Sequence, residues 1–212
     1  GQTANIADQH PERVAAMQEW YENWWAELSP TFSRTSEIYV GADEAPEVNL
    51  TALQWIDAAP PWNQGLIRKA PIGGKRAGTK FNGHWAVKVV KDGTYEFELR
   101  RWPKESGLKL REGTPPHPSE PETLPSYSAP AGRAVPIDSA TLRINGEDLE
   151  TKPVTDDDSV VRFTRELKKG SHKFSPLFTV EDDQGEPGQE LGAYYMTVKP
   201  APAARAAAET NQ

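Results

Sequence analysis

The sequence contains no cysteine among its 212 residues. This absence excludes disulfide bonds, thiolate chemistry and cysteine-ligated metal centres, and it leaves the redox compartment unidentified. An apolar run long enough to cross a bilayer is also missing. Basic residues are fewer than acidic ones, 24 against 31, so the net charge is −7. This balance argues against a nucleic-acid partner, because nucleic-acid phosphates require a basic face.

Recognisable catalytic and metal-binding motifs are lacking as well. The histidines are far apart and have no metal-ligand spacing; they are His10, His84, His117 and His172. The acidic stretches 155–159 and 181–188 do not match an EF-hand loop, so we interpret them as solvated turns rather than calcium sites. The glycine-rich stretch 68–83 lacks phosphate-loop spacing, which indicates an ordinary basic loop.

An amphipathic helix is predicted near the start of the chain. Pro11 suits the first helical position, and Glu12 then lies near the positive end of the helix dipole. Apolar residues follow at three- and four-residue steps and form one broad aromatic face. This face comprises Val14, Met17, Trp20, Tyr21, Trp24, Trp25 and Leu28. We interpret it as a packing surface for a large neighbour rather than a row of sugar-binding rings.

From residue 36 onward the pattern is that of short strands separated by glycine turns. Strands are predicted at 37–41, 48–56, 84–102, 137–146, 159–167, 172–180 and 192–198. The spacing predicts a mainly β domain over 36–199, an antiparallel, jelly-roll-like β-sandwich of about seven or eight strands. A proline-rich insertion at 104–136 and a disordered tail at 200–212 complete the chain.

The stretch 84–102 predicts a β-hairpin. A three-residue loop with a left-handed Gly93 would set Val87 opposite Phe97 and Lys88 opposite Glu96. Glu96 would then lie with Glu98 on a charged outer face. Because a solvated sheet face explains both carboxylates, we do not interpret them as a glycosidase pair.

A candidate ligand-binding segment follows the second predicted strand. It combines indole rings with amide and carboxylate side chains, which suits stacking and hydrogen bonding to a sugar. Its residues are Trp55, Asp57, Trp62, Asn63 and Gln64, with Arg101 and Trp102 as further candidates. The alternative is a structural loop in which Trp62 is buried and the amides cap backbone groups.

The opening stretch GQTANIADQHPERVAAMQEWYENWW resembles the C-terminal part of formylglycine-dependent, arylsulfatase-type sulfatases. In that family a turn, a short spacer and His-Pro-Glu precede the last helix of the catalytic domain. The matching residues are Gly1, Gln2, Thr3, Asn5, Ala7, His10, Pro11, Glu12 and Val14. The stretches LTALQWIDAAPPWNQ, GHWAVKVVKDGTYEFELRRWP, AVPIDSATLRING and GAYYMTV resemble β-rich extensions of some bacterial members.

This resemblance implies that 1–35 is the terminal helix segment of an α/β catalytic domain, followed by an accessory sandwich. The aromatic face would pack on that preceding domain. The formylglycine and Ca2+ of the family would belong there too, since the chain has no C/S-x-P-x-R motif; its nearest match, 128–133, has Gly where Arg is required. No cofactor, metal ligand or catalytic residue is therefore expected in this chain.

The resemblance also implies a partner and a location. The whole protein would hydrolyse sulfate esters of carbohydrates or aryl sulfates in the periplasm or outside the cell, whereas this chain alone would be inactive. Two alternatives remain open from the residues themselves: a free-standing carbohydrate-binding sandwich, and an inert structural scaffold.

Overall fold

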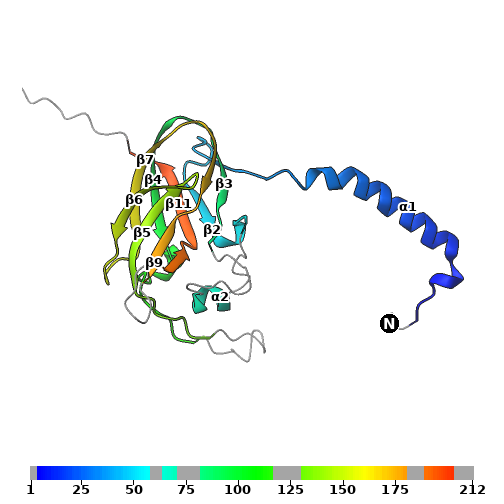
Figure 1. Ribbon diagram of the computed structural model, residues 1–212, viewed down its shortest axis with the longest axis horizontal. Coiled ribbons are helices and arrows are strands. Elements are labelled where there is room, and N and C mark those ends of the chain that lie inside the picture. Colours follow the sequence, from blue (N-terminus) through cyan, green and yellow to red (C-terminus); the bar gives the residue numbers. More distant parts are fainter. Residues whose placement is uncertain (1–3, 58–63, 71–81, 117–129, 181–188, 203–212) are drawn as a thin grey trace, which may run out of the picture. The chain divides into compact units, whose positions relative to one another are not determined.

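The computed structural model describes residues 4–57, 64–70, 82–116, 130–180 and 189–202. The chain forms two compact units, Gly1–Ser36 and Glu37–Gln212. The first unit carries one long helix and the second is a sandwich of two β-sheets (Figure 1). The predicted fold class, mainly β with an N-terminal helix, is confirmed.

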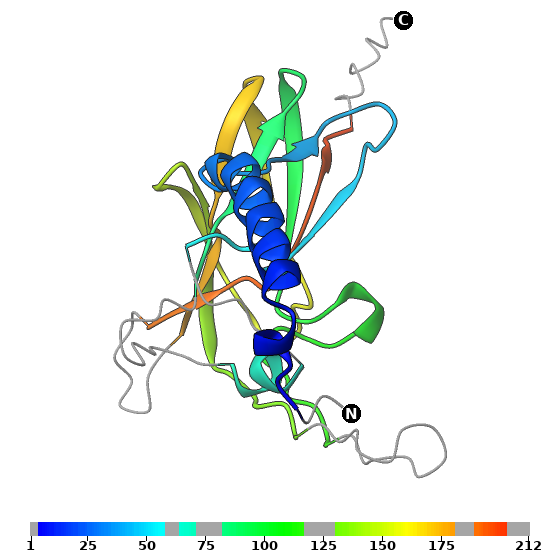
Figure 2. The same ribbon diagram turned by 90° about the vertical axis from the view of Figure 1, so that its right-hand side faces the viewer.

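Helix α1 spans Pro11–Leu28, in agreement with the predicted amphipathic helix. Pro11 occupies the first turn after His10, and Glu12 is the acidic residue of that turn. Figure 2 shows α1 as one continuous helix. Short 3-10 helices flank it at η1 (Ala7–Gln9) and η2 (Ser29–Thr31). None of the residues of α1 is buried.

The larger of the two sheets, hereafter the large sheet, has seven strands. Its order is β1 (Ile38–Val40), β3 (Trp85–Val89), β8 (Gly170–Phe174), β5 (Ile137–Ile144), β9 (Leu177–Val180) and β10 (Gln189–Gly192), and β6 (Glu147–Pro153) also pairs with β5. The β1–β3 pair is parallel, and the other pairs are antiparallel.

The second sheet, hereafter the small sheet, has four antiparallel strands. Its order is β2 (Val48–Thr51), β11 (Tyr195–Pro200), β4 (Gly93–Arg100) and β7 (Val161–Leu167). The short elements η3 (Ala52–Gln54), α2 (Gln64–Lys69) and η4 (Lys104–Ser106) lie in the connections.

The core lies between the sheets and is rich in aromatic rings. Phe97 of the small sheet contacts Phe174 of the large sheet edge to face, with ring centroids 5.5 Å apart. Trp85 is fully buried beside them in the same cluster and donates its indole N–H to the carbonyl of Thr51 at 2.8 Å. Burial of such large rings supplies most of the hydrophobic stabilisation of a sandwich.

The predicted hairpin over 84–102 is wrong. Strand β3 belongs to the large sheet and β4 to the small sheet, so the chain crosses between the layers after β3. Lys88 faces Glu37 at 3.9 Å, whereas Glu96 pairs with Lys199 at 2.9 Å. The inward-facing sets were nevertheless predicted correctly, since Val87 and Phe97 are both buried. Alternation of apolar residues is the same whether two strands pair or face each other across a core.

Other strands and turns differ in detail from the prediction. The predicted strand 172–180 is divided into β8 and β9, and Gly93 begins β4 without a left-handed conformation. Strand β6 was not predicted because each of its residues is exposed or half-buried, which leaves no apolar face to detect. The turn at Asn145 and Gly146 is confirmed, with φ of 54° and 85° as a two-residue hairpin requires.

The proline-rich insertion contributes to the core in its described part. Leu110 and Val135 are buried against the sandwich, and Thr114 bridges to Gly132. Arg68 of α2 donates to the hydroxyl of Thr114 at 2.8 Å. Both ends of the insertion are therefore fixed to the domain, a result that its low apolar content did not predict.

Candidate binding site on the small sheet

The outer face of the small sheet is polar. Three neighbouring strands place alternate side chains on this face: Asn49 and Thr51 from β2, Tyr195, Thr197 and Lys199 from β11, and Glu96, Glu98 and Arg100 from β4. The strand register brings these residues together in rows, because Tyr195 pairs with both Thr51 and Arg100. Thr197 in turn pairs with both Asn49 and Glu98.

A pocket of about 550 Å³ lies on this face. Its residues are Glu47, Asn49, Leu50, Thr51, Arg100, Pro103, Lys104, Glu105, Tyr195, Met196 and Thr197. The volume falls within the range of small-molecule sites. One side of the pocket is sheet and the other is the turn containing η4, so its floor is held by regular backbone hydrogen bonds.

Glu98 is the electrostatic centre of the face. Its side chain is only 6% exposed and accepts from Arg100 Nη2 at 2.6 Å. Arg162 Nε and Lys199 Nζ lie 3.1 and 3.5 Å from its other oxygen. Burial by itself raises the pKa of Glu98, but hydrogen bonds and charge from Arg100, with Arg162 and Lys199, outweigh it and lower the pKa to about 2. Glu98 is therefore ionised throughout the physiological range.

The pocket also contains neutral polar side chains, among them Asn49, Thr197 and Tyr195. The hydroxyl of Thr197 donates to Asn49 Oδ1 at 2.7 Å, which orients the amide and leaves its N–H donors for a ligand. Burial, with a smaller contribution from Glu105, raises the pKa of Tyr195 and keeps it a phenol. Among the described residues, no partner bonds to the Tyr195 hydroxyl.

This arrangement suits recognition more than catalysis. It offers donors, acceptors and the ring of Tyr195 on a rigid floor, and the neighbouring carboxylate of Glu98 is engaged by three cations, which makes it a poor base at neutral pH. Within the described ranges, no three His, Asp or Glu side chains are grouped as metal ligands.

The segment proposed from the sequence as a sugar site is only partly described. Trp55 is buried, with its ring centroid 5.8 Å from that of Trp85 and 5.9 Å from that of Tyr194, so its faces are occupied by the core. Asp57 has a positive φ of 60° and is exposed. Trp62 and Asn63 lie outside the described residues, and Gln64 is the first residue of α2. A ligand site at 62–64 stays a prediction.

Asp57 Oδ2 lies 3.7 Å from His84 Nδ1. The pKa of His84 is lowered mainly by burial and to a smaller extent by the positive charge of Lys173, and the negative charge of Asp57 offsets only part of this effect. The imidazole is therefore neutral at pH 7, and the contact is not an ion pair under those conditions.

Arg101 and Trp102 are buried anchors of the proline-rich segment. Arg101 is 0% exposed. It donates to the carbonyls of Leu110 and Glu112 at 3.3 and 3.2 Å and to that of Arg133. Trp102 donates to Glu112 at 3.0 Å, and the guanidinium of Arg101 lies 4.5 Å from its ring centre. The preceding residue, Arg100, is the one that lines the pocket.

The pocket residues Arg100, Tyr195 and Thr197, which the sequence analysis missed, carry a detectable signal. On β4 the polar residues Glu96, Glu98 and Arg100 share one parity, and on β11 Tyr195, Thr197 and Lys199 share one. Such polar alternation indicates an outer face. What the sequence could not provide is the register that places Tyr195 next to Arg100.

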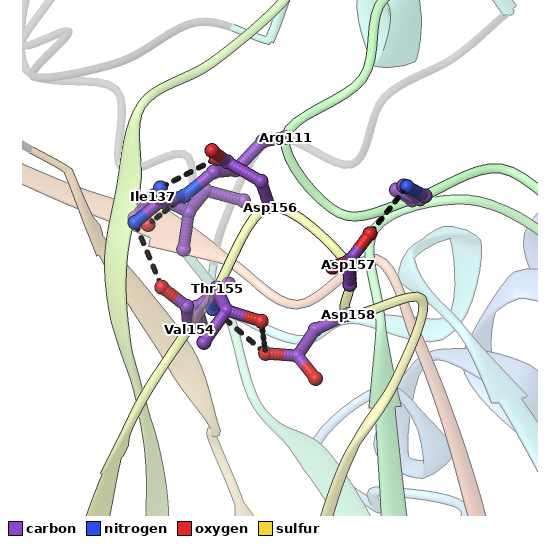
Figure 3. A network of polar contacts seen from close by, with 8 residues as sticks. Arg111, Ile137, Val154, Thr155, Asp156, Asp157 and Asp158 are labelled. Carbon is purple, nitrogen blue, oxygen red and sulfur yellow. Dashed lines mark hydrogen bonds and ion pairs between the residues drawn. The ribbon is translucent and has the colours of Figure 1, made fainter.

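The carboxylates of the acidic turn at 155–158 bind other groups of the chain (Figure 3). Asp156 binds Arg111 at 2.7 Å, and Asp157 binds Lys109 at 2.7 Å. Asp158 accepts from the backbone and the hydroxyl of Thr155 at 2.7 and 2.8 Å. Each carboxylate therefore has a partner within the chain, in agreement with a turn rather than an ion site. The second acidic stretch, 181–188, lies outside the described residues.

The aromatic face of α1 is exposed. Met17 and Trp20 are each 67% exposed, and Trp24 and Trp25 are 42% and 43% exposed. The rings stack on one another, with Trp20 and Trp24 parallel at 6.3 Å between centroids. Apolar patches of this kind mark interaction surfaces in soluble proteins. In the described part of the chain, no helix is both long and apolar enough to span a membrane.

Comparisons with known proteins show no family for this chain. No model of a known protein family matches the sequence, and no curated protein matches it. A family 35 carbohydrate-binding module from Clostridium thermocellum matches 74% of this chain and 100% of its own, at 13% identity and a TM-score of 0.34. The CBM36-1 domain of a multidomain xylanase from the Trinervitermes trinervoides hindgut metagenome matches 74% and 99%, at 12% identity and 0.33.

Pika GITRL matches 56% of this chain and 79% of its own, at 13% identity and a TM-score of 0.25. Scores and identities this low carry no conclusion about ligands. What the chain's own coordinates define is a β-sandwich with a polar pocket on one outer face.

Proposed function

We propose that the sandwich is a carbohydrate-binding module whose ligand occupies the pocket of the small sheet. The observation that carries this proposal is the pocket itself, about 550 Å³ in volume, in which a tyrosine ring lies among oriented polar side chains. A saccharide presents hydroxyl groups that both donate and accept, together with an apolar ring face. A site that binds it needs the same combination.

Preorganisation supports a binding role. Asn49 is oriented by Thr197, and Arg100 is held by Glu98 before any ligand arrives. Both pairs stand on strands rather than on loops, so little conformational entropy is lost when a ligand is bound. The polar residues of this face are therefore placed at fixed distances that a rigid sugar ring can match.

The test is glycan binding by the whole 212-residue chain. A glycan array identifies the ligand, and isothermal titration then measures its affinity for the wild type and for Tyr195→Ala and Asn49→Ala. We expect each substitution to weaken binding at least about tenfold, the equivalent of one lost good contact. Thr164→Ala is the matched control, because Thr164 lies on the same sheet outside the pocket. Absence of glycan binding, or equal affinity in all variants, contradicts the proposal.

A second candidate function is that of the C-terminal region of a sulfatase, as the resemblance of the first helix implies. The observation that favours it is the exposed aromatic face of α1, which lies in a compact unit of its own, Gly1–Ser36. A preceding catalytic domain is the partner that this hypothesis supplies. The glycan-binding sandwich would then be an accessory to hydrolysis of sulfate esters outside the cytoplasm.

Extending the reading frame upstream of Gly1 tests this second candidate. The extended protein should contain a C/S-x-P-x-R motif and hydrolyse an aryl sulfate. Trp24→Ser should lower its melting temperature, because Trp24 would be covered by the catalytic domain in the extended protein. An upstream frame without the motif excludes the sulfatase hypothesis and leaves carbohydrate binding standing.

A further inference from the structure

We infer that the pocket selects an uncharged saccharide and discriminates against sulfated or carboxylated glycans. This inference rests on the proposed carbohydrate-binding function and adds the class of ligand. It also separates the two candidate functions, since the substrate of a sulfatase would carry the group that this pocket disfavours.

The first step is the charge of the lining. The pocket contains two acidic residues, Glu47 and Glu105, and two basic residues, Arg100 and Lys104. Preference for a sulfate ester over a neutral sugar requires a local excess of positive charge, because charged donors form the strong hydrogen bonds to an anion. The lining supplies no such excess, and the chain as a whole carries a net charge of −7.

The second step is that Arg100 is already engaged. Its side chain is 9% exposed and its Nη2 lies 2.6 Å from Glu98. To bind a sulfate in the same geometry, Arg100 would have to leave Glu98 or share its charge with a second anion. If Arg100 left Glu98, a buried carboxylate would lose part of its charge compensation, which is unfavourable. If Arg100 bound both groups, the sulfate and the carboxylate would repel each other at short distance.

The other cations on this face are engaged as well. Lys199 bonds to Glu96 at 2.9 Å and approaches Glu98 at 3.5 Å, and Arg162 bonds to Glu98 at 3.1 Å. Neither residue lines the pocket. Lys104 is exposed and lies next to Glu105 in the sequence, so solvent and its acidic neighbour weaken its field.

On the sheet floor of the pocket, the groups left for a ligand are neutral ones. They are the amide N–H donors of Asn49 and the hydroxyl and ring of Tyr195. These groups pair with hydroxyls and with the apolar face of a sugar ring, and none of them compensates a negative charge.

The experiment compares oligosaccharides of the same backbone and length with and without sulfate groups, titrated into the whole chain. We expect the neutral member to bind at least about tenfold more tightly. Its affinity should not change between about 50 mM and about 500 mM NaCl, because no charge is neutralised on binding. A uronate-containing oligosaccharide provides a second anionic probe.

Glu98→Gln is the decisive variant, because it releases Arg100 from its counterion. It should gain affinity for the sulfated member, in a salt-dependent manner, while binding of the neutral member is retained or weakened. Glu96→Gln is the matched control. It removes the same charge from the same strand but releases Lys199, which does not line the pocket. Far-ultraviolet circular dichroism confirms that each variant is folded.

The outcomes are distinguishable. Tighter binding of the sulfated or uronate member by the wild type overturns this inference and leaves carbohydrate binding intact. If no glycan binds, the proposed function fails and the inference fails with it. Neutral binding that survives Tyr195→Ala and Asn49→Ala assigns the ligand to another surface and overturns the inference for this pocket.

Discussion

Glu98 and Arg100 lie two residues apart on β4 and form an ion pair, with Oε2 and Nη2 2.6 Å apart, on the outer face of the small sheet. Because adjacent strands supply Arg162 and Lys199 to the same carboxylate, this pair links three strands. It stabilises the sheet and also holds Arg100, which lines the pocket.

The pKa of Glu98, lowered to about 2 from 4.5, makes the stability of the domain depend on acidity. A carboxylate with a depressed folded-state pKa stabilises the fold above its unfolded pKa, and this contribution is lost as the pH falls from about 4.5 toward 2. Glu98→Gln should therefore lower the free energy of unfolding by about 3 kcal/mol at neutral pH. The difference from wild type should shrink below pH 4.5, as measured by urea denaturation at several pH values. Glu47→Gln, which alters an exposed carboxylate, is the control, and equal curves for Glu98→Gln and wild type would refute the role of the pair.

Arg101 should be a major contributor to the stability of the proline-rich segment. Its guanidinium satisfies the carbonyls of Leu110, Glu112 and Arg133 in a fully buried position. Arg101→Met removes these donors and should destabilise the chain by about 3 kcal/mol, measured as a shift of the urea midpoint. Arg133→Met should have little effect, because its side chain is exposed and its carbonyl remains. Similar losses in both variants would contradict this assignment.

Gly41 and Gly146 both have a left-handed backbone, with φ of 83° and 85°, but their surroundings differ. A Cβ at Gly41 would collide with the ring and hydroxyl of Tyr95, whose hydroxyl donates to Lys91 at 2.8 Å. Gly146 has nothing within 4 Å of that position. We expect Gly146→Ala to lower the free energy of unfolding by about 1 kcal/mol, the cost of a left-handed backbone at a residue with a Cβ. Gly41→Ala should lower it by more than about 2 kcal/mol, measured by thermal unfolding, because Tyr95 must also move. Equal losses in the two variants would mean that Tyr95 moves aside without a cost in stability.

The aromatic face of α1 should promote self-association, because it is a contiguous exposed apolar patch. Replacing Trp20 and Trp24 with Gln removes two large apolar side chains from this patch, 67% and 42% exposed. Self-association, measured by light scattering across a concentration series, should decrease in this variant. Trp85→Phe is the contrasting variant: it alters a fully buried ring, so it should lower the unfolding midpoint without removing the patch. Unchanged self-association in the Trp20 and Trp24 variant would contradict this assignment.

Local patterns predicted much of the fold. The helix at α1 follows from Pro11 and a three- and four-residue apolar period, and the Asn145-Gly146 turn follows from its dipeptide alone. The inward positions on β3 and β4 were correct because alternation reports burial directly. These features depend on neighbours within a few residues, and such information is present in any short stretch of sequence.

Pairing between distant segments could not be predicted in the same way. Val87 and Phe97 alternate as a hairpin would, yet their strands lie in different sheets, because the sequence does not say whether two apolar faces pair or oppose each other. The binding pocket was missed for a related reason. Tyr195 and Arg100 are far apart in the sequence, and they become neighbours only through the register in which β11 pairs with β4.

Strand β11 is the last of the described strands along the chain, yet it lies in the middle of the small sheet, between β2 and β4. Among the strands that the structure describes, β11 is the one neighbour of β2 in that sheet, so this pairing cannot form during synthesis until residues 195–200 have left the ribosome. Assembly of this layer is consequently a late, long-range event, of the kind that slows folding. A polypeptide released early would expose the edge of β4 that β11 covers and would lack the pocket residues Tyr195, Met196 and Thr197.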